Sequence, residues 1–148
     1  MKMNKSFLVH CLVTASLSIP FCTKAATQQP SNDIVKESAF ACVGMAHKYG
    51  SDGRRFDYEN VKTFISSQVD DCVRLLSFSL VNKTTGKDIL DNIESEWATT
   101  YYDVTDEEYS FYGEFHENLM SGAQKAAENH DYLNEMVLFG KSAANGHH

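Results

Sequence analysis

The sequence predicts an all-α fold, a compact bundle of about five helices with one disulfide, after a cleaved N-terminal signal peptide. Three observations support this prediction. Apolar residues recur at spacings of three and four through most of the chain after residue 31. Proline occurs only at positions 20 and 30, so no proline interrupts these segments. No alternating run of β-branched residues is long enough to predict a strand.

Residues 1–25 have the layout of a secretory signal peptide. Lys2 and Lys5 form a positive start, and an apolar segment follows from residue 7 to residue 19. Small residues lead to a cleavage site after Ala25, with cleavage after Ala26 as an alternative. The apolar segment is shorter than the ~18 residues of a spanning helix, although a retained anchor stays an alternative. We therefore expect an exported, periplasmic protein.

After removal of residues 1–25, the chain is predicted to consist of a polar leader (26–31), a helical domain (32–140) and a flexible tail (141–148). This removal also leaves Cys42 and Cys72 as the only cysteines. An even pair in an oxidising compartment predicts one disulfide, and both cysteines lie on apolar helix faces. Such a bridge would join the first helix to the second and add roughly 3–4 kcal/mol of stability.

The first two predicted helices follow directly from their apolar stripes. Ser31 or Asn32 caps a helix that Gly50 ends. The next stripe extends from Asp57 to Val81, either as one helix or as two that are separated near residues 66–67.

The remaining helices are predicted from capping patterns. Thr85, with an acid three residues later, caps a third helix after a connection over residues 82–87. Thr105 and Glu108 form a capping box for a fourth helix, whose inward face begins with Tyr109. A short last helix covers residues 131–139.

Charge excludes two classes of partner. Residues 26–148 contain all 20 acids and 10 of the 13 Lys and Arg residues, which gives a formal charge of −10. This balance argues against binding to nucleic acid and to anionic membrane surfaces. It is compatible with a basic protein partner.

No motif predicts catalysis, a metal or a cofactor. Cys42 and His47 differ by five residues, which turns them about 140° apart on a helix. A nucleophile and its base need hydrogen-bond reach, so this pair is not expected to be catalytic. The sequence contains no zinc-binding or di-iron spacing of histidines, cysteines and acids. We expect surface or half-buried histidines and a protein that is not an enzyme.

The candidate binding segment is acidic and aromatic. Residues 88–124 contain ten acids, seven aromatic residues and no Lys or Arg. Exposed aromatic side chains beside carboxylates would suit an interface with a cationic protein. The alternative is a solvated acidic face over an aromatic core. The predicted partner-binding residues are Tyr101, Tyr102, Asp103, Asp106, Glu107, Glu108 and Tyr109.

The signal peptide, the phrase AFACVGMAHKYG and the cysteine in DDCVRLL resemble the periplasmic immunity proteins of type VI secretion. The group in question inhibits peptidoglycan amidase effectors. This resemblance implies a non-enzymatic inhibitor that occludes the active site of a secreted cell-wall amidase or other hydrolase with an inter-helix loop. Residues 82–87 and 101–106 are the candidate loops, and the second is favoured. A small periplasmic acid-stress chaperone is the alternative function, and a homodimer remains open.

Overall fold

The computed structural model describes residues 27–50, 58–100 and 106–146. Its regular elements are all α-helices, which confirms the predicted all-α fold. They are α2 (Asn32–Tyr49), α3 (Tyr58–Val81), α4 (Lys83–Thr100), α5 (Asp106–Glu128) and α6 (His130–Asn145). The expected signal peptide lies outside the described residues. No helix in the described ranges is long and apolar enough to cross a membrane.

The first two helices agree with their sequence patterns. Ser31 caps α2, and its side-chain oxygen accepts a hydrogen bond from the backbone N–H of Ile34. Gly50 follows the last residue of α2, as predicted. α3 is one continuous helix through Ser66 and Ser67. The Ser67 hydroxyl donates to the carbonyl oxygen of Phe64 at 2.8 Å, so the helix accommodates this polar residue without a break.

The connection predicted over residues 82–87 is wrong. Asn82 alone separates α3 from α4, and its Oδ1 accepts hydrogen bonds from the backbone N–H groups of Thr84 (2.9 Å) and Thr85 (3.2 Å). Asn82 therefore supplies the capping interaction that the sequence analysis assigned to Thr85. As a result, residues 83–87 are helical and cannot form an inhibitory loop.

The chain after α5 is more helical than predicted. Asn129 separates α5 from α6 and caps α6, with its Oδ1 accepting from the backbone N–H of Tyr132 at 3.0 Å. α6 then continues to Asn145. The tail predicted from residue 141 is thus helical over its first five residues, and only residues 147–148 lie outside the described part.

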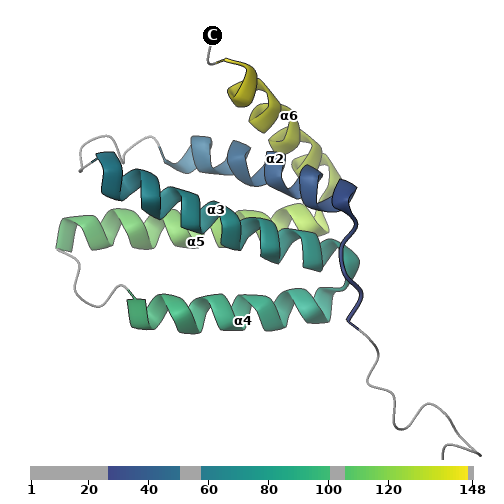
Figure 1. Cartoon of the computed structure of the whole chain (residues 1–148), viewed down its shortest axis with the longest axis horizontal. Helices are drawn as coiled ribbons and strands as arrows, with labels where there is room; N and C mark the ends of the chain where they lie inside the picture. Colours follow the sequence, from purple (N-terminus) through teal and green to yellow (C-terminus); the bar gives the residue numbers. More distant parts are fainter. Residues whose placement is uncertain (1–26, 51–57, 101–105, 147–148) are drawn as a thin grey trace, which may run out of the picture.

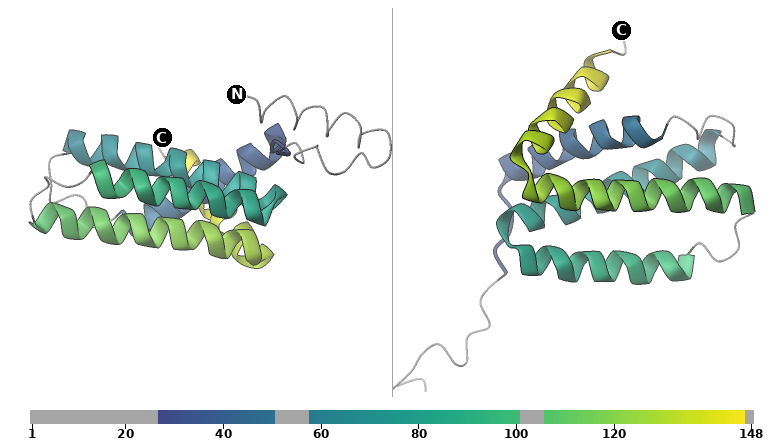
Figure 2. Two further views of the ribbon diagram at one scale, coloured as in Figure 1. Left: turned by 90° about the horizontal axis from the view of Figure 1, so that it is seen from below. Right: turned by 180° about the vertical axis from the view of Figure 1, so that it is seen from behind.

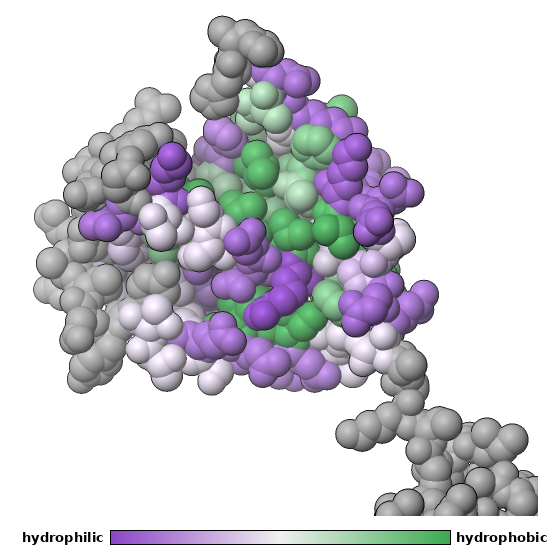
Figure 3. Space-filling model, in the orientation of Figure 1, coloured by the Kyte–Doolittle hydropathy of each residue, from purple (hydrophilic) through white to green (hydrophobic). Residues whose placement is uncertain are grey.

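α3 occupies the centre of the bundle and packs against α2, α4 and α5 (Figure 1). Successive helices from α2 to α5 alternate in direction, and α6 crosses α2 at a steep angle (Figures 1 and 2). Within the described helices, α4 packs extensively only against α3. The lower edge of the face in Figure 3 is largely hydrophilic, and Figure 1 places α4 there.

α2 and α6 approach each other closely where two glycines meet. A Cβ added to Gly140 would overlap the carbonyl oxygen of Phe40, and one added to Gly44 would overlap the carbonyl oxygen of Met136. Only glycine lets two helix backbones lie at this separation. The pair of glycines therefore fixes the site at which α6 crosses α2.

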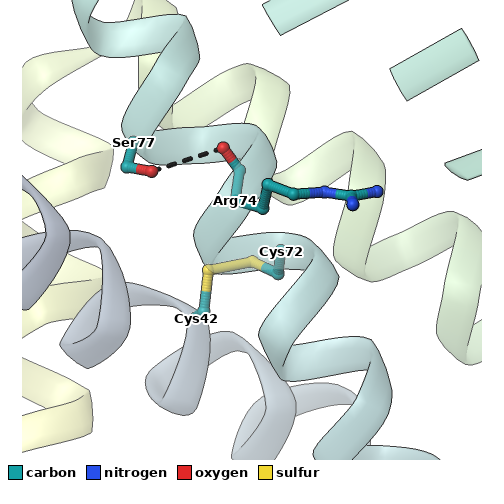
Figure 4. Close-up of a disulfide and its surroundings, with 4 residues drawn as sticks. All are labelled: Cys42, Cys72, Arg74 and Ser77. Carbon is teal, nitrogen blue, oxygen red and sulfur yellow. Dashed lines mark hydrogen bonds between the residues drawn. A yellow bond between two sulfur atoms is a disulfide. The ribbon is translucent and has the colours of Figure 1, made fainter. Parts of the chain in front are cut away.

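The predicted disulfide is confirmed. Cys42 of α2 and Cys72 of α3 are bonded, with a Cα–Cα distance of 5.9 Å, and neither side chain is exposed to solvent (Figure 4). The bridge joins the first two helices across the core, beside the α3 segment that carries Arg74 and Ser77 (Figure 4). A structural disulfide is typical of oxidising compartments outside the cytoplasm.

Candidate functional site

The predicted partner-binding set is only partly described by the structure. Residues 101–103, the first three of the set, lie outside the described ranges. The next three, at positions 106–108, begin α5, and their side chains are also outside the described part. Tyr109 is described, and half of its side chain is exposed (50%). It does not contribute to the inward face of α5, contrary to the expected helix face.

Most of the described aromatic side chains of α4 and α5 belong to the core. They surround Phe64 of α3, which stacks on Tyr112 with ring centroids 4.1 Å apart. Phe115 lies edge-on to Phe64 at 5.6 Å, and Trp97 of α4 lies 6.0 Å from it. The aromatic-core alternative is therefore correct for Phe111, Tyr112 and Phe115, whereas Trp97 is half-buried and packs against this core.

His116 of α5 is buried, with 2% of its side chain exposed, contrary to the expected surface or half-buried histidines. Its Nε2 lies 2.9 Å from Oε1 of Glu94, and its Nδ1 lies 2.6 Å from Oε1 of Gln68. Nε2–H donates to Glu94, since an ionised carboxylate only accepts. The Gln68 amide can form a hydrogen bond with Nδ1 whether or not that nitrogen carries a proton, because the amide group has both a donor and an acceptor. The imidazole thus links α3, α4 and α5.

Trp97 completes this polar cluster. Its indole stacks on the His116 imidazole, with ring centroids 4.1 Å apart and planes inclined by 14°. The stack covers a buried polar ring with an apolar one and joins α4 to α5 through side chains. Trp97 and His116 lie 19 positions apart in the sequence, and no motif indicates that they pair.

A pocket of about 390 Å³ opens beside this stack, between α4 and α5. We call it the α4–α5 pocket. It combines carboxylates, aromatic rings and one glycine, and its lining consists of Glu94, Trp97, Tyr109, Ser110, Gly113, Glu114, His116 and Glu117. Within the described part of the chain, Tyr109 is the one residue of the predicted partner-binding set that is found in this lining.

A smaller pocket of about 170 Å³ lies between α3 and α4, and Trp97 and His116 line it as well. Asp71 contributes a carboxylate to this pocket. Burial raises the pKa of Asp71 above its ordinary value of 3.8, although the nearby Arg74 guanidinium acts in the opposite direction. The charge of Glu96 reinforces the upward shift.

A third pocket has a lining of different chemistry. It measures about 540 Å³, lies between α2 and α6, and contains two acids and two lysines among its lining residues. One of these lysines, Lys141, lies over the ring of Phe40 with Nζ 5.5 Å from the ring centroid. The two charge signs balance each other there, so this pocket has no clear preference for a charged partner.

The described residues show no arrangement of three or more His, Cys, Asp or Glu side chains that could hold a metal ion. The Cys42 sulfur is bonded to that of Cys72 and is therefore not a free thiol nucleophile. His47, its neighbour in sequence, is exposed at the end of α2.

Comparison with known proteins gives no match to a family model, to a curated protein sequence or to a solved structure.

Proposed function

We propose that this protein is an exported, non-enzymatic binding protein that neutralises a basic protein partner. The α4–α5 pocket carries this proposal, because it places three carboxylates beside two aromatic side chains. Aromatic side chains anchor protein interfaces, while carboxylates speed the encounter with a cationic partner. The resemblance of the first two helices to immunity proteins suggests a secreted peptidoglycan hydrolase as the partner.

The charge pattern around the pocket supports a cationic partner. The stretch from Asp88 to Gln124, which contains most of α4 and α5, has no Lys or Arg. In the described residues, no lysine or arginine forms an ion pair with Glu114 or Glu117. Glu114 and Glu117 are three residues apart on one helix, where like charges destabilise by a few tenths of a kcal/mol. A bound cationic protein would relieve that repulsion.

Calorimetric titration tests the proposal. We expect the gene beside that of this protein to encode a secreted peptidoglycan hydrolase, and its product is the titrant. Peptidoglycan hydrolysis is followed in parallel. We expect one tight complex, loss of hydrolysis, and weaker binding as salt rises from about 50 mM to about 500 mM, because salt screens exposed charges. The double variant Glu114→Lys/Glu117→Lys should bind more weakly, while Glu128→Lys/Glu135→Lys, at two exposed acids outside the pocket, serves as the control of equal charge change.

Two results would contradict the proposal. If the affinity depends neither on salt nor on the charge reversals at Glu114 and Glu117, the acidic surface is not part of the interface. Binding of many unfolded proteins in acid, without one tight partner at neutral pH, would instead indicate an acid-stress chaperone.

A further inference from the structure

Among the described residues, Gly113 has no packing role. It lies within α5, where glycine is about 1 kcal/mol less favourable than alanine. A Cβ added there would meet no atom of the described residues within 4 Å, whereas one added to Gly44 or Gly140 would meet backbone atoms of another helix. The glycine leaves open space at the α4–α5 pocket that no side chain of the described structure fills.

The chemistry around this space suits one kind of group. Glu114 follows Gly113, Glu117 lies one turn farther along α5, and Glu94 contributes from α4. The exposed ring of Tyr109 and the indole of Trp97 provide apolar surface beside these carboxylates. At about 390 Å³, the pocket is at the small end of the range of about 300–1,000 Å³ for ligand pockets.

We propose that the α4–α5 pocket receives an arginine side chain of the basic protein partner. A guanidinium group is planar, always charged and more weakly hydrated than an ammonium group. It therefore packs against aromatic rings and forms paired hydrogen bonds with carboxylates in the same site. The inference rests on the proposed function. It adds that the partner inserts an arginine guanidinium group and that the residues of the α4–α5 pocket bind it.

Trp97 offers a direct measurement, because it is the single tryptophan of the chain and lines the pocket. The probes are nona-arginine and nona-lysine, titrated into the full-length protein while tryptophan fluorescence is followed. We expect a saturable change with nona-arginine and at least about threefold weaker binding of nona-lysine. The absence of a saturable change, or equal affinity for the two peptides, would overturn the inference.

Two substitutions of Gly113 separate pocket filling from effects on folding. Gly113→Leu places a larger side chain in the open space and should weaken nona-arginine binding at least about tenfold. Gly113→Ala leaves most of the space open and should bind within about threefold of the unaltered protein. Both variants should fold, since the added Cβ meets none of the described residues within 4 Å and the position lies at an open pocket. Unchanged binding by Gly113→Leu would overturn the inference.

The charge requirement is tested by Glu117→Gln, with Glu135→Gln on α6 as the control of equal charge change. Only the first should weaken nona-arginine binding if Glu117 contacts the guanidinium. Equal losses in the two variants would show a general charge effect and would overturn the pocket assignment.

The same variants distinguish this inference from the proposed function. If the Glu114→Lys/Glu117→Lys variant loses the hydrolase while Gly113→Leu keeps it, the arginine pocket is rejected and the proposed function stands. If nona-arginine enters the pocket but no basic hydrolase binds, the proposed function is rejected and the chemistry of the pocket stands.

Discussion

The indole ring of Trp97 lies nearly parallel to the imidazole ring of His116, with ring centroids 4.1 Å apart. This contact joins α4 to α5, although α4 packs extensively only against α3 within the described helices. The two ring nitrogens of His116 form hydrogen bonds with Gln68 of α3 and Glu94 of α4. The stack and the two hydrogen bonds together position one wall of the α4–α5 pocket.

Replacement of His116 by alanine should lower the free energy of unfolding by about 2–4 kcal/mol, because it leaves a cavity and deprives buried Gln68 of its partner. Urea denaturation followed by circular dichroism measures this loss. His130→Ala is the matched control, since His130 is exposed at the start of α6 and should change stability by less than about 0.5 kcal/mol. Equal losses in the two variants would contradict a structural role for the His116 hydrogen bonds.

Alanine substitutions at two glycines should change stability in opposite directions. Gly113→Ala should raise the free energy of unfolding by about 0.5–1 kcal/mol, because alanine favours a helix and the added methyl group meets open space. Gly140→Ala should lower it by about 1–3 kcal/mol or more, because its Cβ would overlap the carbonyl oxygen of Phe40. Thermal unfolding of both variants gives the comparison, and a gain at Gly140 would contradict close packing of α2 and α6.

Capping residues, apolar periodicity and the cysteine count were sufficient to predict the bounds of α2 and the disulfide. Ser31 and Gly50 lie at the ends of a single apolar stripe, so the bounds of α2 were correct. Cys42 and Cys72 were paired correctly because they are the only two cysteines after the predicted cleavage site and both lie on apolar faces.

Other features depend on choices between similar local signals or on contacts that are distant in sequence. Asn82 and Thr85 are both good capping residues, and the structure uses the first. The burial of His116 depends on Gln68, which is 48 residues away, and on Glu94, which is 22 residues away. No periodic pattern specifies such a pairing, so these residues resemble an ordinary helix face in the sequence.

Removal of the disulfide should lower the free energy of unfolding by about 3–4 kcal/mol, because the bridge closes a loop between residues 30 positions apart. Cys42→Ala/Cys72→Ala is the appropriate variant, since it removes both thiols. Urea denaturation with and without a reductant provides the measurement. Reductant should destabilise the unaltered protein and leave the double variant unchanged, and sensitivity of the variant would assign the effect to something other than this bridge.

Replacement of Asp71 by asparagine should stabilise the protein more at neutral pH than in acid. Burial raises the pKa of Asp71 in the folded protein above its ordinary value of 3.8. The folded state therefore binds the proton more tightly than the unfolded state, and ionisation of Asp71 opposes folding. This cost is absent below the unfolded pKa and develops fully once the pH exceeds the folded pKa.

Urea denaturation of the Asp71→Asn variant and the unaltered protein at about pH 3 and about pH 7 tests this direction. The difference in free energy of unfolding, variant minus unaltered protein, should be more positive at the higher pH. Asp70→Asn is the control, because Asp70 is exposed on the same turn of α3. A difference for Asp71→Asn that is the same at both pH values, or that reverses, would show that the Asp71 carboxyl does not oppose folding when it ionises.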